Sequence, residues 1–124
     1  MKSKSIFDVL KLDANGLVAA VVQDVNTKQV LMVGYMNRES IEITLRERRA
    51  CFWSRSRQKL WRKGESSGNV LNLVEIRTDC DNDAILLVCD PVGPTCHTNE
   101  TSCFYRVVEA DGTLVLSGDG VAAE

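Results

Sequence analysis

Runs of apolar and β-branched residues, each bounded by polar turn residues, recur along the chain and predict strands. Residues 17–23 and 29–35 form two such runs, and the polar segment 24–28 between them is typical of a β-hairpin turn. Further strands are expected at residues 51–53, 70–77, 84–89, 103–109 and 113–116. The last two would pair as a terminal hairpin. The run at 84–89 is apolar on both faces, which predicts a deeply buried strand.

Only one segment shows the pattern of an amphipathic helix. Asn37 is placed to cap a helix that runs from Arg38 to about Arg49. Met36 and Ile41 can form a hydrophobic staple across its first turn. One clear helix among several strands predicts an α+β fold with a mostly antiparallel β-sheet. A doubly wound sheet is disfavoured because the strands are not interleaved with helices.

Length and composition are typical of one globular domain. The chain has 124 residues, of which 44% are hydrophobic and 26% charged, so we expect residues 1–124 to form a single compact domain. No apolar run approaches the roughly 18 residues that a membrane-spanning helix needs. The lysines near the amino terminus precede no apolar stretch, which argues against a secretory signal. These features predict a cytoplasmic protein without a membrane partner.

The net charge of −2 hides an uneven distribution. Residues 38–63 carry nine basic and three acidic side chains, a net charge of +6, whereas residues 79–90 carry four aspartates and no base. One positive and one negative stretch are typical of a protein that binds an anion and a cation. Two solvated faces would give the same pattern.

Five cysteines accompany a single histidine. An odd number of cysteines without a secretory signal argues against a disulfide framework. Cys51 and Cys89 lie in apolar runs and are expected in the core. The other three, Cys80, Cys96 and Cys103, stand among polar and turn residues, where packing explains them less well.

Three carboxylates, those of Asp79, Asp81 and Asp83, alternate along a short segment. In an extended chain they project from one face and Cys80 projects from the other. Carboxylates this close repel one another unless a cation neutralises them, and their oxygens suit Mg²⁺ or Ca²⁺. An EF-hand is excluded because its glycine and glutamate are absent at the required positions. The alternative is an acidic turn in water.

Cys96, His97 and Cys103 place two thiols and an imidazole in one turn-rich part of the chain, and Cys80 can add a third thiol. Zinc binds sulfur and nitrogen ligands, and a catalytic zinc site uses three protein ligands. If His97 is a fourth ligand, the site is closed and structural. If His97 stands beside the metal, it is free to transfer protons. Burial of the cysteines without a metal is the remaining alternative.

The basic segment 53–69 has the composition of an anion-binding loop, and residues 54–69 show no apolar period. Arginine forks match phosphate oxygens, hydroxyl groups add hydrogen bonds, and glycines allow close backbone approach. Its candidate substrate-binding residues are Trp53, Ser54, Arg55, Ser56, Arg57, Lys59, Trp61, Lys63, Gly64, Ser66, Ser67 and Gly68. The sequence pI of about 5.4 favours a small phosphorylated ligand over a nucleic acid.

Several known signatures are absent. A single histidine excludes the His-Glu-x-x-His helix of zinc proteases. The base-deaminase pattern is missing. The glycine-containing segment 63–68 also lacks the Gly-Lys-Ser/Thr end of a Walker A loop.

Segments 53–69, 79–84 and 93–98, together with 102–105, closely resemble the phosphoribosyl-AMP cyclohydrolase family. The likeness extends from about Gly16 to Arg106. The resemblance implies a hydrolase of histidine biosynthesis that opens the N1–C6 bond of the adenine ring of phosphoribosyl-AMP. The product would be the phosphoribosyl-formimino-aminoimidazole carboxamide ribonucleotide. One departure is Thr101, at a place where the family often has a basic residue.

The resemblance also implies a homodimer that shares zinc, with Cys80 from one chain and Cys96 and Cys103 from the other. It implies that Mg²⁺ is held by three aspartates, which are Asp79, Asp81 and Asp83. His97 would relay a proton between the attacking water and ring nitrogen N1. The two phosphate groups of the substrate account for the positive segment 38–63 better than a single anion does.

A second hypothesis comes from another functional class. In an RNA-binding module, Cys80, Cys96, His97 and Cys103 would close a structural zinc site, and the basic segment would hold single strands. Replacement of His97 by alanine distinguishes the two, because the module would lose zinc whereas the enzyme would lose only turnover.

Overall fold

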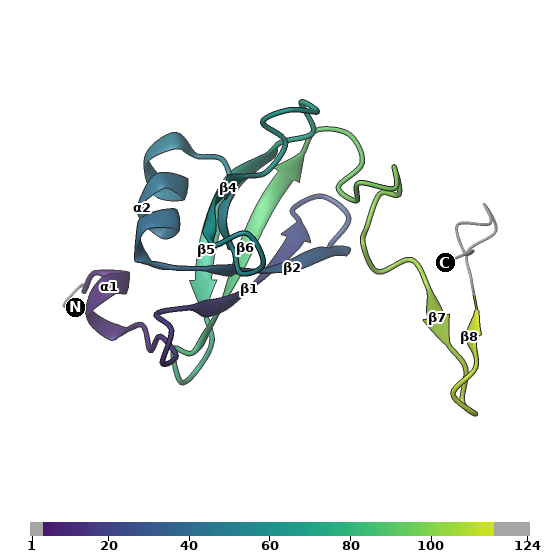
Figure 1. Cartoon of the computed structure of the whole chain (residues 1–124), viewed down its shortest axis with the longest axis horizontal. Helices are drawn as coiled ribbons and strands as arrows, with labels where there is room; N and C mark the ends of the chain where they lie inside the picture. Colours follow the sequence, from purple (N-terminus) through teal and green to yellow (C-terminus); the bar gives the residue numbers. More distant parts are fainter. Residues whose placement is uncertain (1–3, 116–124) are drawn as a thin grey trace.

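The computed structural model describes residues 4–115 and shows a sheet-rich body, one well-formed helix and a small hairpin that projects away (Figure 1). In chain order the elements are α1 (Ile6–Val9), β1 (Val18–Asp24), β2 (Val30–Met36), α2 (Arg38–Glu47), β3 (Cys51–Ser54), β4 (Lys59–Arg62), β5 (Leu71–Thr78), β6 (Ala84–Pro91), β7 (Val107–Val108) and β8 (Leu114–Val115). The α+β fold with one clear helix and mostly antiparallel strands is therefore confirmed. No helix in this described part is long and apolar enough to cross a bilayer.

A four-stranded sheet in the order β2-β1-β6-β5 forms the centre of the body. The predicted hairpin is confirmed, since β1 and β2 pair antiparallel from Val18 with Met36 to Gln23 with Val30. β5 and β6 also pair antiparallel, whereas the two central strands, β1 and β6, run parallel. The start of β6 therefore lies at the same end of the sheet as the end of β2, and the end of β6 lies at the same end as the start of β2, with β1 between the two strands.

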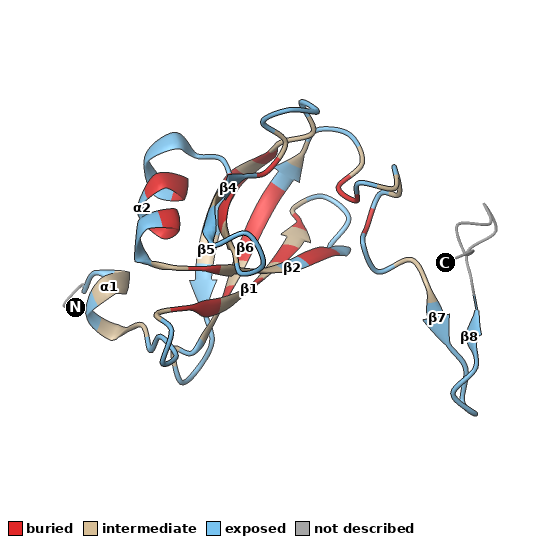
Figure 2. Cartoon of the chain, viewed as in Figure 1, coloured by how far each residue is buried: buried red, intermediate tan, exposed pale blue. Residues whose placement is uncertain are grey.

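The core lies where this sheet meets α2 and β3 (Figure 2). The strand predicted to be deeply buried is β6, whose Ile85, Leu87 and Cys89 are at most 2% exposed. Cys51 is also fully buried, so both cysteines expected in the core are there. Burial raises the pKa of the Cys51 thiol and raises that of Cys89 to about 12. Both thiols therefore stay protonated at neutral pH.

Asn37 caps α2 as its position predicts. Its side-chain oxygen accepts a hydrogen bond from the Ser40 N–H (2.8 Å), and the Ser40 hydroxyl accepts one from the Asn37 N–H (2.9 Å). The helix ends before Arg49, earlier than expected, because Arg48 adopts a left-handed conformation with φ of 59°. The Arg48 carbonyl then accepts a hydrogen bond from the Leu73 N–H (2.9 Å), which joins this corner to β5.

The sequence predicts a loop over residues 54–69, and this prediction is wrong for residues 59–62, which form β4. β3 and β4 pair antiparallel from Cys51 with Arg62 to Ser54 with Lys59, so the basic segment is a hairpin followed by further turns. β4 is charged at both ends and mostly exposed, so it lacks the apolar alternation from which a strand is predicted.

Two other differences concern the ends of the described chain. The sequence does not predict α1, because a four-residue helix is too short to show a period. The terminal hairpin is confirmed, but β7 and β8 have only two residues each. Leu116, expected in its second strand, lies outside the described residues. Figure 2 shows that the hairpin is exposed along its length.

The buried hydroxyl of Thr44 joins α2 to β3. Thr44 Oγ1 accepts a hydrogen bond from the Cys51 N–H (2.9 Å) and donates one to the Ser40 carbonyl (2.8 Å). Thr44→Val keeps the volume but removes the acceptor of the buried Cys51 N–H, so we expect the free energy of unfolding to fall by about 1–3 kcal/mol. Urea unfolding measures the change, with Thr44→Ser as the control that keeps the hydroxyl. Equal stability of the valine variant and the wild type would contradict this role.

Candidate active site

A cavity of about 520 Å³ opens between the turns around β4 and the segment that follows β6. The predicted substrate residues that line it are Arg57, Lys59, Trp61, Lys63, Gly64, Ser66 and Ser67. Cys96, His97 and Cys103 line the same cavity from the segment that follows β6. The structure therefore brings most of the basic segment to one cavity with the predicted thiol and imidazole groups.

The segment that carries the thiols is fastened to β2. The Ser102 hydroxyl donates a hydrogen bond to the Val30 carbonyl (2.7 Å), and the Cys103 N–H donates one to the Leu31 carbonyl (2.8 Å). Ser102 is only 3% exposed, so this attachment lies in the interior. It fixes Cys103 at the start of β2, at the end of the sheet where β6 finishes.

Cys96 and Cys103 lie together but differ in acidity. Burial raises the pKa of Cys96, but a hydrogen bond from the Thr98 hydroxyl to its sulfur (3.0 Å) and one from Cys103 bring the pKa below the ordinary cysteine value. Burial of the thiol and the neighbouring Cys96 raise the pKa of Cys103 to about 11, and the charge of Lys63 offsets part of this rise. Cys96 is therefore the thiol that ionises first, and the thiolate is the form that binds metals.

His97 is exposed and lies directly after Cys96. It lines the main cavity and also an adjoining hollow formed with Phe104, Tyr105 and Arg106. An imidazole at this junction can reach a ligand from the same side as the two thiols.

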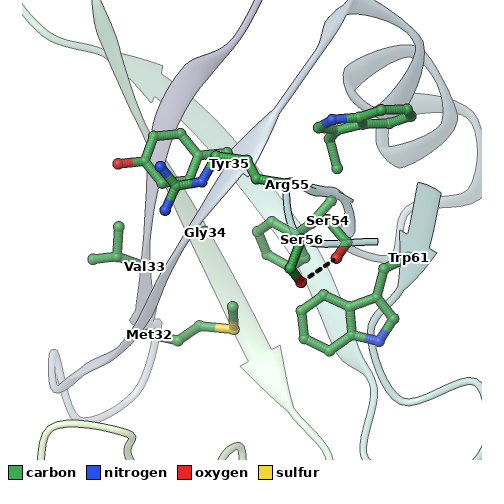
Figure 3. Close-up of a pocket in the computed structure, with 10 residues that line it drawn as sticks. Met32, Val33, Gly34, Tyr35, Ser54, Arg55, Ser56 and Trp61 are labelled. Atoms are coloured by element: carbon green, nitrogen blue, oxygen red, sulfur yellow. Dashed lines mark hydrogen bonds between the residues drawn. The ribbon is translucent and has the colours of Figure 1, made fainter. Parts of the chain in front are cut away.

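Four residues of the predicted substrate-binding set line a second hollow instead of the main cavity. The sequence does not predict that the set divides between two hollows. The second hollow has a volume of about 500 Å³ and takes Trp53, Ser54, Arg55 and Ser56 from the predicted set (Figure 3). Met32 and Trp61 line both spaces, so the two adjoin. Gly68 lines neither of them.

Arg55 is held in place over an aromatic ring in this second hollow. Its guanidinium lies 3.8 Å from the centroid of Tyr35 on β2, and the hydroxyl oxygens of Ser54 and Ser56 are 3.5 Å apart (Figure 3). An arginine and two hydroxyl groups on one wall are a suitable set for an oxyanion. Each of the two hollows therefore contains cationic side chains.

Lys63 differs from the other basic residues because it is only 8% exposed. Burial lowers the pKa of its ammonium group, and Nζ donates a hydrogen bond to the Asn69 carbonyl (3.3 Å). Its charge faces a backbone oxygen of the neighbouring turn.

Asp79, Asp81 and Asp83 converge, with candidate ligand oxygens within 4.8 Å of one another. The sequence predicts that they share one face of an extended segment, but the structure places them in a turn. The turn forms because Asp79 Oδ1 accepts hydrogen bonds from the N–H groups of Asp83 (3.0 Å) and Ala84 (3.2 Å). Partial desolvation raises the pKa of Asp79, but these hydrogen bonds lower it overall. Hydrogen bonding and repulsion from its two neighbours raise the pKa of Asp83. Oxygen donors this close together suit a hard divalent cation.

Cys80 does not join the other two candidate zinc ligands within one chain. It lies exposed in the turn between β5 and β6, at the start of β6, whereas Cys103 bonds to Leu31 on β2, toward the end of the sheet where β6 finishes. β6 has eight residues. At about 3.3 Å per residue the two ends of β6 are roughly 23 Å apart. Within residues 4–115, the three aspartates are the one group of potential metal ligands that converges.

Five residues that line the main cavity are outside the predicted site set: Met32, Glu65, Asn69, Thr95 and Asn99. Met32 belongs to a strand and gave no sign of lying at a site. The other four lie in turn-rich segments, whose glycines and prolines were visible in the sequence. A turn signal indicates a change of direction but not which side chain faces a cavity.

The model of a family described as phosphoribosyl-AMP cyclohydrolase matches residues 32–105. The chain belongs to the phosphoribosyl-AMP cyclohydrolase family. It is 58% identical to a phosphoribosyl-AMP cyclohydrolase of Sphingopyxis alaskensis over 109 residues, which cover 88% of this chain and 86% of the relative. It is 52% identical to a phosphoribosyl-AMP cyclohydrolase of Rhodospirillum centenum over 116 residues, which cover 94% of this chain and 86% of the relative. It is 51% identical to one of Chlorobium phaeovibrioides over 113 residues, which cover 91% of this chain and 82% of the relative.

Membership of the phosphoribosyl-AMP cyclohydrolase family decides between the two functional classes considered from the sequence. The family is a family of enzymes, and the resemblance stated from three motifs is confirmed. The RNA-binding module is therefore not supported.

The raised pKa of Asp83 predicts that a cation stabilises this cyclohydrolase in a pH-dependent way. The folded, cation-free protein binds a proton at Asp83 more tightly than the unfolded chain does, so its stability falls as the pH rises through that pKa. Mg²⁺ held by the three carboxylates would take the place of this proton, so we expect Mg²⁺ to raise the thermal midpoint at pH 7 and to have little effect near pH 4. Calorimetry at constant ionic strength measures this. Asp83→Asn is the control with a reduced response, and an equal Mg²⁺ effect at both pH values would contradict the prediction.

Proposed function

We propose that this protein hydrolyses the N1–C6 bond of the adenine ring of phosphoribosyl-AMP, as a step of histidine biosynthesis. The observation that carries the proposal is the main cavity, where Arg57 and Lys59 face the same space as Cys96, His97 and Cys103. The relatives named as phosphoribosyl-AMP cyclohydrolases support the choice of substrate. We take residues 1–124 as one domain with this activity.

The substrate carries two phosphate groups, and the chain has two adjoining hollows with cationic side chains. Arg57 and Lys59 would bind one phosphate in the main cavity. Arg55 would bind the other beyond Met32 and Trp61, which separate the two hollows. An indole at this boundary can stack on a flat base. A ligand with one anionic group would leave one of these hollows without a partner.

The donor atoms of Cys96 and Cys103 suit zinc, because they are soft sulfur ligands and one of them ionises readily. The third ligand in our proposal is Cys80 of a second copy of the chain, since Cys80 lies at the far end of the sheet within one copy. Zinc would supply the Lewis acidity that makes water a nucleophile near neutral pH. A homodimer of this kind completes two equivalent sites.

The β7–β8 hairpin supports the homodimer. Val107 and Val108 are 61% and 65% exposed, and Phe104 before them is 60% exposed. Figure 1 shows the hairpin standing away from the body. Apolar side chains exposed together on a projecting segment are typical of a surface that a partner covers. We take this partner to be a second copy of the chain, because the proposed zinc site needs Cys80 from one copy and Cys96 and Cys103 from the other.

His97 is the proposed proton carrier. Its position beside Cys96 and at the junction of two hollows lets the imidazole take a proton from the attacking water and return it to N1 of the ring. In the same proposal Asp79, Asp81 and Asp83 hold Mg²⁺. All five cysteines are free thiols, which supports a reducing cytoplasmic location.

Turnover can be followed directly, because opening the purine changes its ultraviolet absorbance. Wild-type protein is expected to convert phosphoribosyl-AMP and to lose activity on zinc chelation. His97→Ala is expected to bind as much zinc as the wild type but to lose at least about 100-fold in kcat, since proton transfer contributes that much or more. Metal analysis accompanies the assay. A wild type that is inactive with Zn²⁺ and Mg²⁺ supplied would overturn the proposal.

Shared zinc ligands can be tested by mixing two inactive variants. Cys80→Ala and Cys96→Ala would each disrupt every site of their own homodimer. After random exchange of subunits, half of the dimers are mixed and each mixed dimer has one intact site, so about a quarter of the wild-type activity is expected to return. The matched control mixes Cys96→Ala with Cys103→Ala, which lie on the same side of the site and cannot complement. No recovery after verified exchange would contradict a site divided between chains.

A further inference from the structure

We propose that Asn69 orients the purine ring of the substrate, with its carboxamide hydrogen-bonded to the edge formed by N7 and the nitrogen on C6. This inference rests on the proposed function and adds to it a residue that determines which base the site accepts. Asn69 lines the main cavity together with Cys96 and His97.

The backbone of Asn69 is held on both sides. Its carbonyl accepts a hydrogen bond from Lys63 Nζ (3.3 Å), and its N–H donates one to the Ser67 hydroxyl (3.1 Å). Lys63 is nearly buried, so this contact is shielded from water. A fixed backbone restricts the positions that the side chain can reach, which reduces the entropy lost when it binds a ligand.

Two glycines allow other parts of the chain to approach Asn69 closely. A Cβ on Gly64 would lie 2.5 Å from the Asn69 carbonyl carbon and oxygen, and a Cβ on Gly93 would lie 2.6 Å from its side-chain Oδ1. Both glycines have positive φ, at 82° and 70°, which other residues rarely adopt. The carboxamide therefore packs against the turn that leads into Cys96, at the reacting side of the cavity.

The carboxamide itself is unengaged. Among residues 4–115, no side chain or backbone group hydrogen-bonds to it, so one acceptor and two donors are available to a ligand. A carboxamide pairs with adenine by accepting from the nitrogen on C6 and donating to N7, a pattern that a phosphate does not offer. Arg57 and Lys59 in the same cavity supply cationic groups for phosphate. The chemistry therefore assigns Asn69 to the base.

Contact with this edge of the purine would also serve the reaction. C6 carries one of the two contacted atoms, so the contact holds the carbon that water attacks. Correct placement of a reacting carbon accelerates a reaction in addition to tightening binding. Loss of the contact should consequently lower kcat as well as raise KM.

The test compares the binding of AMP, IMP and ribose 5-phosphate by calorimetry. We expect Asn69→Ala to weaken AMP binding about tenfold or more and to change ribose 5-phosphate binding less than about twofold. IMP has oxygen in place of the nitrogen on C6, so the wild type should prefer AMP and the variant should lose that preference. Asn69→Asp keeps the size but cannot donate to N7, and it should weaken AMP binding similarly. The matched control is Asn72→Ala, a half-buried asparagine on β5 outside the cavity.

Equal AMP affinity of Asn69→Ala and the wild type would overturn the inference. An equal loss for AMP and ribose 5-phosphate, or a wild type that does not prefer AMP to IMP, would do the same. Thermal unfolding checks folding, and the contacts from Lys63 and Ser67 use backbone atoms that the substitutions retain. Turnover of phosphoribosyl-AMP by the wild type tests the proposed function separately, since AMP binding needs no reaction.

Discussion

The hydrogen bonds that Ser102 and Cys103 make to the first residues of β2 are the contacts on which the site depends. The segment after β6 leaves the sheet where the Val92 N–H donates to the Val70 carbonyl (2.9 Å), and it returns at Ser102. Between these two attachments the backbone folds on itself, with Thr95 N–H bonded to the Thr101 carbonyl. The thiols and the imidazole are thus presented by a loop that is fixed at both ends, and a fixed loop can hold reacting groups at a constant distance from the basic turns.

The sheet also keeps opposite charges apart. The aspartate turn lies at the start of β6, whereas the main cavity with Arg57, Lys59 and Lys63 lies toward the start of β2. Carboxylates in that cavity would compete with phosphate for the same donors. Asp79, Asp81 and Asp83 line neither of the two hollows, so each cluster can bind an ion of opposite charge. The uneven charge of the sequence therefore corresponds to a real division in space.

Features set by local, periodic patterns were predictable, and features set by contacts between distant segments were not. The β1–β2 hairpin, the Asn37 cap and the buried β6 each follow from alternation or capping within one short segment. β4 was not predicted because its exposed, charged residues show no alternation of apolar and polar positions. The motifs identified most of the residues in the main cavity, but not its division from the Arg55 hollow, because Met32 and Trp61 come from different sheets. Asn69 was not predicted as a site residue because its position in the cavity depends on close packing against Gly64 and Gly93.

The parallel pairing of β1 with β6 has a consequence for how the chain folds. These strands come from opposite halves of the sequence, so the centre of the sheet closes only after the intervening elements have been synthesised. Contacts of such long sequence separation slow folding, because the loop between them must close before the contacts stabilise it. Until then the β1–β2 hairpin carries an unpaired edge with apolar side chains, which is a surface prone to aggregation. A newly made chain is therefore most vulnerable just before the segment with Cys96 and Cys103 emerges from the ribosome.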